Sequence, residues 1–163
     1  MGGDYYSRAA TATSGGPAFA TAEDGRNEEA AKAAIEAAWN VEMVRYGGRF
    51  NPIDWYALRD GRIVAYVELK TRSHAPEAFP TVFLNQRKWL ALTMSFVYTA
   101  VPSIFAVRFA GGEVRWIEVD RIDARRLEVA GCKKLVKART DREPVIHVPI
   151  AEMHVLKTRR DSA

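Results

Sequence analysis

Apolar residues dominate residues 51–71, and the longest polar interruption is RDGR, which contains Asp60-Gly61. The second half of this stretch, RIVAYVELKT, is rich in β-branched, aromatic and aliphatic residues, as strands are. Because Asp-Gly is a turn signal, the stretch predicts a hairpin of two strands. Both faces of the strand pair are largely apolar, which is typical of strands covered on both sides in an α/β protein.

Helical patterns lie on both sides of this hairpin in the chain. An alanine-rich stretch follows Asn27, which can cap a helix, and it predicts a helix that continues until Gly47-Gly48. A second helix is predicted from residue 86, capped by Asn85 and ended by Pro102. The sequence therefore places one helix before the hairpin and one after it.

Further strands complete the pattern. We expect a short strand over 81–84, a second hairpin around Gly111-Gly112, and an extended piece with a final helical turn within 143–156. The order α-β-β-β-α-β-β predicts an α/β domain, with a central mixed β-sheet flanked by helices.

Aperiodic segments bound this domain. Residues 1–25 are rich in Gly, Ala, Ser and Thr, which predicts a flexible N-terminal tail. We expect one domain over 26–156 and a C-terminal tail over 157–163. No basic region followed by an apolar run opens the sequence, and charges or prolines break its apolar stretches. We therefore expect neither a signal peptide nor a membrane span.

The charge distribution adds a candidate partner. The net charge is +4, and residues 121–142 hold eight Arg or Lys against three Asp or Glu. Such a basic patch attracts polyanions such as nucleic acid, although a solvated surface has the same pattern. Cys132 is the one cysteine of the sequence, which excludes a disulfide or a cysteine-based zinc site within one chain. This usage suits a reducing, cytoplasmic setting.

The arms of the first hairpin carry acids and a base. Glu68 and Lys70 share a face because strand positions two apart point the same way. A two-residue loop at Asp60-Gly61 would turn Asp54 and Glu68 to opposite faces, whereas a three-residue loop beginning at Arg59 would place them on one face. A single bulge would also place them on one face. The sequence leaves these registers open.

The first predicted helix brings further acids toward this hairpin. Glu28 shares a side of the helix with residues at helical spacing, namely Ala31, Ile35, Ala38 and Glu42. Glu28 is therefore the acid expected to point inward. Glu29 and then Glu36 are the alternatives.

A sheet face with these acids and a lysine has a definite chemistry. Carboxylates that lie close together repel each other, and a cation among them relieves the repulsion. Oxygen ligands suit Mg²⁺ or Mn²⁺, which keep several waters and also bind phosphate oxygens. A neighbouring lysine can polarise a water, so the set is suited to metal-assisted phosphodiester hydrolysis.

This arrangement resembles the PD-(D/E)XK nuclease superfamily. Asp54 in NPID is followed, after thirteen residues, by Glu68-Leu69-Lys70 in VELKT. The acids of the first helix and the opening NQRKWL of the second stand in the family's order. The resemblance covers residues 27 to about 119, and it is to small archaeal-type Holliday junction resolvases and small phage nucleases. It implies a restriction-endonuclease-like core.

The resemblance also implies roles for individual residues. Mg²⁺, for which Mn²⁺ substitutes, would be held by Asp54, Glu68 and the carbonyl of Leu69, with Glu28 as the helix acid. Lys70 would activate or orient the water, and Gln86 would contact the site or the scissile backbone. Basic residues after the motif, on the second helix and in the basic segment are expected to bind DNA: Arg72, Arg87, Lys88, Lys133, Lys134 and Lys137.

Arg87 and Lys88 lie in the first turn of the second helix, where the helix dipole disfavours cations. Their position indicates that they meet an anion.

The expected function is a metal-dependent deoxyribonuclease, an endonuclease rather than an exonuclease, with structure-specific cutting as in a Holliday junction resolvase. A homodimer is expected by the same resemblance, because two symmetric cuts need two sites, and the expected origin is a phage or prophage. The alternative is a catalytically silent nucleic-acid-binding module on a nuclease fold.

The remaining candidates have simpler explanations. The histidines His74, His147 and His154 lack metal-ligand spacing and are expected at the surface or with local partners. The four tryptophans are expected in the core rather than as stacking platforms.

Overall fold

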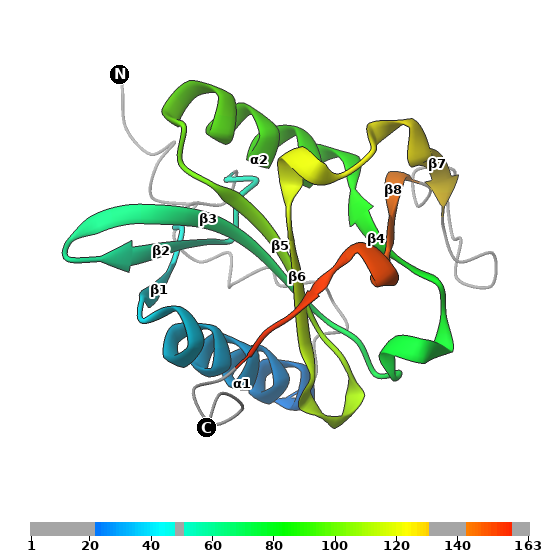
Figure 1. The fold of residues 1–163 in the computed structure, drawn as a ribbon, viewed down its shortest axis with the longest axis horizontal. Helices are drawn as coiled ribbons and strands as arrows, with labels where there is room; N and C mark the ends of the chain where they lie inside the picture. The colour runs from blue at the N-terminus through cyan, green and yellow to red at the C-terminus, as the bar shows by residue number, and fades with distance from the viewer. Residues whose placement is uncertain (1–21, 48–50, 131–142, 158–163) are drawn as a thin grey trace, which may run out of the picture.

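The computed structural model of the protein describes residues 22–47, 51–130 and 143–157 (Figure 1). Its centre is a six-stranded mixed sheet in the order β1-β2-β3-β5-β6-β9. The β3–β5 pair is parallel and the other pairs of this sheet are antiparallel. The strands are β1 (Glu42–Arg45), β2 (Trp55–Arg59), β3 (Arg62–Thr71), β5 (Ser103–Arg108), β6 (Val114–Glu118) and β9 (His154–Val155).

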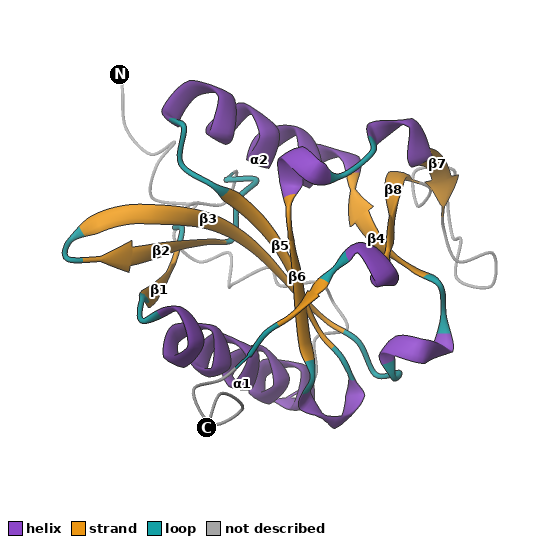
Figure 2. Cartoon of the chain, in the orientation of Figure 1, coloured by secondary structure: helices purple, strands orange, loops and turns teal. Residues whose placement is uncertain are grey.

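Two helices lie on opposite faces of this sheet, α1 (Ala22–Trp39) on one and α2 (Gln86–Thr99) on the other (Figure 2). The prediction of a central mixed sheet flanked by helices is therefore confirmed. A second, antiparallel sheet in the order β4-β8-β7 shares the α2 side; its strands are β4 (Thr81–Asn85), β8 (Glu143–Pro149) and β7 (Leu127–Ala130). No helix in the described ranges is long and apolar enough to cross a membrane.

Short 3₁₀ helices occupy several connections: Pro76–Ala78, Ala110–Gly112, Val119–Arg121, Ala124–Arg126 and Ile150–Glu152.

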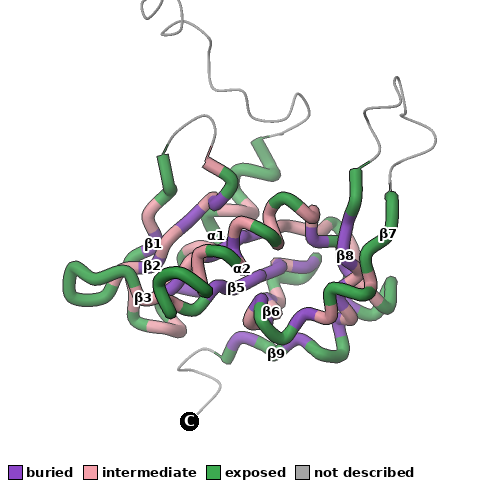
Figure 3. Tube along the Cα trace, turned by 90° about the horizontal axis from the view of Figure 1, so that it is seen from above, coloured by how far each residue is buried: buried purple, intermediate pink, exposed green. Residues whose placement is uncertain are grey.

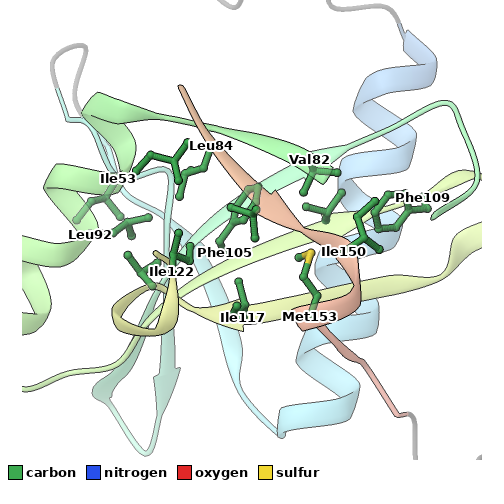
Figure 4. Close-up of a cluster of buried hydrophobic side chains, with 14 residues drawn as sticks. Ile53, Val82, Leu84, Leu92, Phe105, Phe109, Ile117, Ile122, Ile150 and Met153 are labelled. Carbon is green, nitrogen blue, oxygen red and sulfur yellow. The ribbon is translucent and has the colours of Figure 1, made fainter. Parts of the chain in front are cut away.

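Two hydrophobic cores lie on the two faces of the main sheet, as the alternation along the strands requires. Ala31 and Ile35 of α1 pack with Val67 and Leu69 of β3 in one core. The other core lies between the sheet, α2 and the second sheet, and it includes Leu92 of α2 and many residues of both sheets (Figure 4). Figure 3 shows buried positions following the paths of β5 and β8 through the interior.

The first predicted helix has the wrong bounds at both ends. Helix α1 begins at Ala22, so Asn27 lies inside it and accepts a hydrogen bond from Arg108 Nη1 at 2.9 Å instead of capping it. It ends at Trp39, followed by Asn40 with φ 51°, a left-handed conformation that asparagine tolerates. Residues 42–45 form strand β1, with Met43 buried, because they complete the edge of the sheet. Glu42 is therefore not on the helix.

The later elements are partly as predicted. Helix α2 begins after Asn85, whose side chain accepts from the Arg87 backbone N–H at 2.8 Å, and β5 and β6 form the hairpin around Gly111-Gly112. The second sheet was not predicted. Strand β4 pairs with β8, which is about 60 residues further along the chain, and hydrophobic periodicity does not identify such a partner.

The register of the first hairpin is settled by a bulge. Arg59 pairs with Arg62 across the two-residue loop, where Asp60 and Gly61 have φ values of 51° and 72°. These positive values are those of the type I′ turn that favours Asp-Gly. Leu58 then pairs with Ile63, but Ala57 pairs with Ala65, so Val64 is one extra residue on β3. Extended one step beyond Trp55–Val67, this register places Asp54 opposite Glu68.

Candidate active site

Strand β3 places Glu68 and Lys70 on the face of the sheet that α2 covers. Glu68 is 1% exposed, whereas Lys70 is partly exposed, and Lys70 Nζ lies 3.1 Å from Glu68 Oε1. The parallel register with β5 sets Glu68 beside Phe105, a fully buried residue of the α2-side core. The acid is thus held in apolar surroundings, where an ionised carboxylate is costly unless it is paired.

Asp54 lies directly before β2 and joins Glu68 on this face. Its backbone carbonyl accepts from Tyr46 N–H at 2.8 Å, which ties the residue to the end of β1. The bulge at Val64 brings its side chain to the side of Glu68 rather than to the α1 side. Asp54 and Glu68, distant in sequence, are therefore neighbours at the rim of the sheet.

Lys88 of α2 joins the two acids. Its ammonium lies 3.1 Å from Glu68 Oε2 and also pairs with Asp54. The first turn of α2 starts where β4 ends, so the second sheet and the helix together aim this side chain at the acids. The anion that Lys88 was expected to meet is, in this structure, the protein's own acid pair.

The electrostatics of the two acids differ. The pKa of Glu68 is raised to about 7, because burial and the neighbouring Asp54 raise it more than the ammonium groups of Lys70 and Lys88 lower it. Burial alone would raise the pKa of Asp54, but its interactions with Glu68 and Lys88 outweigh burial and hold the pKa below its usual range. Near neutral pH, Asp54 is therefore ionised and Glu68 readily exchanges a proton.

One atom of this site lacks a partner of good geometry. Glu68 Oε2 is buried and accepts no hydrogen bond, although Lys88 Nζ is close to it. A buried acceptor of this kind calls for an explanation, and an absent ion is one of the usual ones. The two neighbouring carboxylates of Asp54 and Glu68 fit Mg²⁺ or Mn²⁺, which bind through one or two carboxylates and keep waters for the remaining positions.

The backbone of β3 offers a third oxygen. Tyr66 N donates to Pro102 O and Arg72 N donates to Arg108 O, so even-numbered residues of this part of β3 direct their backbone groups toward β5. Leu69 therefore directs its carbonyl to the other side, where β2 has already ended, because Trp55 is opposite Val67. This geometry is compatible with the Leu69 carbonyl acting as a ligand.

Comparison with known proteins identifies the family of this site. A family model described as "Phage putative PDDEXK endonuclease" matches residues 15–156. The chain belongs to this family. Comparison with curated proteins gives no match.

Among solved structures, the chain is similar to Archaeoglobus fulgidus Hjc, a Holliday junction resolvase from an archaeal hyperthermophile. The identity is 17% and the TM-score 0.47, over 78% of this chain and 97% of that one. The resemblance to PD-(D/E)XK nucleases, with the α/β core that it implied, is confirmed by the family match and by the observed sheet and helices.

Within this PD-(D/E)XK chain, the structure does not bring the helix acids to Asp54 and Glu68. Glu28 lies on α1, on the opposite side of the sheet, and accepts from Arg45 Nη2 at 2.7 Å. Glu36 accepts from the Met43 backbone N–H and pairs with Lys32, and Glu29 is exposed. In the described ranges no third Asp, Glu, His or Cys completes a metal-binding group with the two acids.

The described candidates for DNA contact lie on two segments, the first turn of α2 and the segment directly after β3. Gln86 opens α2 and is partly buried, and Arg87 is exposed beside it. Arg72 follows β3 and is partly buried, which lowers the pKa of its guanidinium, and none of the ion pairs between described residues includes it. Three predicted residues lie outside the described ranges: Lys133, Lys134 and Lys137.

The described arginines of the basic segment have acidic partners. Arg126 donates two hydrogen bonds to Glu152, Arg125 pairs with Asp123, and Arg121 pairs with Glu118. These contacts neutralise much of the charge that the sequence counted there.

The histidines and tryptophans have local partners. His147 lies 3.1 Å from Thr81 Oγ1 and His154 contacts the ring of Trp116, as expected of residues outside a metal site. Trp55 is buried at 3% exposure and Trp89 packs against the α2-side core. Sequence reasoning missed the position of Lys88 at the acid pair, and its place in the unfavourable first turn of α2 was the signal that indicated an anion nearby.

Proposed function

We propose that this protein is a metal-dependent deoxyribonuclease that hydrolyses phosphodiester bonds as an endonuclease. The observation that carries the proposal is the pair Asp54, which directly precedes β2, and Glu68 of β3. They share one face of the sheet and are accompanied there by two lysines. Two adjacent carboxylates are suited to a divalent cation, and the buried Glu68 Oε2 makes no hydrogen bond of good geometry although Lys88 Nζ is 3.1 Å away.

In this proposal Asp54, Glu68 and the Leu69 carbonyl hold Mg²⁺, with Mn²⁺ as a substitute. A bound Mg²⁺ lowers the pKa of a coordinated water and offsets the negative charge that develops on the phosphate. The raised pKa of Glu68 means that the carboxyl loses its proton when a cation is bound, so metal binding and deprotonation are linked.

The two lysines have different parts in the proposal. Lys70 stays on Glu68 Oε1 and is partly exposed, so its ammonium orients the attacking water at the solvent side of the acids. Lys88 lies across both carboxylates, and its long, flexible side chain must leave that position for the acids to take a metal. The displaced ammonium is then close to where the phosphate binds.

Other predicted residues complete the proposed DNA contact. Arg72 and Arg87, together with Lys133, Lys134 and Lys137, would bind the phosphate backbone, and these contacts would weaken with salt and tolerate any sequence. Gln86 would contact the scissile backbone. Glu28 would contribute as the helix acid only if its carboxylate left Arg45 and reached the other face of the sheet. Structure-specific cutting, as the name of the Archaeoglobus protein indicates for that protein, and a homodimer belong to the same proposal.

The proposal is tested with branched, duplex and single-stranded DNA in Mg²⁺ and in EDTA. We expect cleavage that needs the metal and that Asp54→Asn and Glu68→Gln abolish. Asp120→Asn is the matched control, because Asp120 is an exposed acid. Cleavage that persists in either acid variant would contradict the assignment. Sedimentation of the protein, alone and with a junction, tests the dimer.

The Lys88 contacts favour one other candidate. Because Lys88 neutralises the acids without a metal, the cluster can persist in a protein that binds DNA and does not cut it. Such a nucleic-acid-binding module would bind DNA equally well in EDTA and Mg²⁺ and would show no metal-stimulated turnover.

A further inference from the structure

A hollow of about 240 Å³ lies beside the end of β3, between the segment after that strand and β4. Its lining includes Phe79 and Phe83, the two histidines His74 and His147, and Arg72. The volume is below the ~300–1,000 Å³ of pockets that take drug-sized ligands. It is therefore suited to one flat ring system rather than to a larger molecule.

The two phenylalanine rings are exposed, and each contacts a histidine ring. Phe79 is 56% exposed and Phe83 is 43% exposed, and both rings line the same hollow. Phe79 makes an edge-to-face contact with His74 at 4.7 Å, and Phe83 makes one with His147 at 4.6 Å. Two rings kept in place at the surface can bind a flat partner at a small cost in conformational entropy.

The neighbours of Phe83 fix its surroundings further. His147 lies opposite Phe83 in the β4–β8 register, 3.1 Å from Thr81 Oγ1 and 3.2 Å from Glu128 Oε2. Phe83 points to the outer face of the second sheet, because Val82 and Leu84 on either side of it belong to the buried core. Strand β4 is also the edge of its sheet, so no further strand among the described residues pairs with its outer edge.

Arg72 connects the hollow to the acid pair. It follows Lys70 by two residues, so the two Cα atoms are at most about 7 Å apart. Its guanidinium, which lacks an acidic partner among the described residues, is suited to a phosphate or to the face of a base. A nucleic-acid strand whose phosphate lies at Glu68 and Lys70 therefore has Arg72 and the two rings beside it.

We propose that this hollow binds an unpaired nucleobase of the DNA substrate, which packs against both Phe79 and Phe83, with Arg72 on the adjoining phosphate. Stacking on aromatic rings together with a cation is the way in which proteins bind single-stranded nucleic acid. A base inside a duplex has both faces covered by its neighbours, so only an unpaired or flipped base can enter. The inference rests on the proposed nuclease function and deepens it, because it makes the substrate a DNA with unpaired bases near the cut.

The test compares two fluorescent DNAs, a duplex with a single-stranded extension and the same duplex without it, by anisotropy in EDTA at one salt concentration. We expect the native protein to prefer the extended DNA, and we expect Phe79→Leu and Phe83→Leu each to reduce that preference by about tenfold, the typical size of a lost base–ring stack. Tyr98→Leu is the matched control, because Tyr98 is an exposed aromatic residue on α2. A 2-aminopurine in the extension reports the stack directly, through fluorescence quenching that the Phe79 and Phe83 variants lose.

An unchanged preference in the Phe79→Leu, Phe83→Leu double variant would overturn the inference, and so would a native protein without any preference. Sedimentation without DNA tests whether a second copy of the chain occupies the hollow instead. If the variants change self-association and leave the DNA preference intact, the hollow belongs to an interface between copies of the chain, and the inference is wrong. Because binding is measured in EDTA, a protein that keeps the preference but never cuts in Mg²⁺ contradicts only the proposed nuclease function.

Discussion

Replacing Lys88 by methionine tests whether its ammonium stands in for a metal. Methionine keeps the length of the side chain and removes the charge, so the acids Asp54 and Glu68 lose the cation that lies across them. Removal of one partner from a fully buried ion pair costs about 3–5 kcal/mol, whereas exposed pairs contribute about 0–1 kcal/mol. Glu68 is 1% exposed but the Lys88 side chain is 24% exposed, and Glu68 keeps Lys70 on its other oxygen. We therefore expect a loss of about 2 kcal/mol at pH 8 for the metal-free protein.

The loss should depend on pH because Glu68 can take up a proton. Its pKa is raised to about 7 by burial, and Lys88 is one of the groups that keep it from rising further. At pH 6 the Glu68 carboxyl is mostly neutral in both proteins, so only the contact with the partly exposed Asp54 is lost, which costs about 1 kcal/mol or less. Urea unfolding in EDTA at the two pH values measures the difference.

The same variant should bind Mg²⁺ more tightly, because no ammonium has to be displaced. If the free energy of metal binding improves by as much as the ion pair contributed, the dissociation constant falls roughly tenfold or more. Calorimetry with Mg²⁺ or Mn²⁺ measures it. Arg87→Met is the matched control, since Arg87 is the exposed neighbour in the same helical turn. Unchanged stability at pH 8 together with unchanged metal affinity would refute the role given to Lys88. A native protein that binds no metal at all would instead refute the metal site.

Four further predictions concern the protonation of Glu68, the α2-side core, the Asp-Gly turn and the bulge. In EDTA, the free energy of unfolding should fall by up to about 3 kcal/mol as the pH rises from 4.5 to 7, because Glu68 binds its proton more tightly in the folded state than in the unfolded state. Urea titrations of the native protein measure this dependence, and Glu68→Gln should lose it. Leu92→Ala removes a fully buried side chain from the α2-side core and should cost about 2–5 kcal/mol in the same assay, whereas Leu90→Ala, at 45% exposure, should cost far less. Gly61→Ala should cost about 1 kcal/mol, because Gly61 has φ 72°, and thermal melting against Gly25→Ala, at an exposed helical position, shows whether the turn is responsible. Deleting Val64 removes the bulge but leaves the pairs from Ala57–Ala65 onward unchanged, so Asp54 stays opposite Glu68 and the affinity for metal should be kept. Loss of metal binding in a protein that still folds would show that the bulge does more than set the register.

Local sequence signals predicted the elements whose hydrogen bonds depend on residues nearby in the sequence. Asn85 caps α2 as expected, and the Asp-Gly turn joins β2 to β3. The errors are at positions where distant segments decide the outcome. Residues 42–45 are a strand because β2 pairs with them, although the alanine-rich pattern before them favours a longer helix. Strand β4 belongs to the second sheet and not to the main one, because it pairs with β8, which comes late in the chain.

The candidate site was predictable as a set of residue types and not as an arrangement. Asp54, Glu68 and Lys70 follow from spacing, because strand alternation fixes the side of each residue once the register is known. Lys88 is 20 residues beyond Glu68, and only the packing of α2 on the sheet brings it to the acids. Glu28 fails to join them in this structure for the converse reason, since α1 covers the other face and Arg45 binds its carboxylate.

The bulge at Val64 allows a hairpin of this length to satisfy two requirements at the same time. The Asp-Gly turn favours a two-residue loop, and an unbroken ladder from that loop would turn Asp54 and Glu68 to opposite faces. One extra residue on β3 reverses the alternation between the turn and the acids, so the turn keeps its preferred conformation and the carboxylates converge. A bulge disrupts the ladder locally, and in a chain with thirteen residues between Asp54 and Glu68 it is the feature that brings the two carboxylates to one cation. That cation is Lys88 in the structure, and we propose that it is Mg²⁺ when the protein cuts DNA.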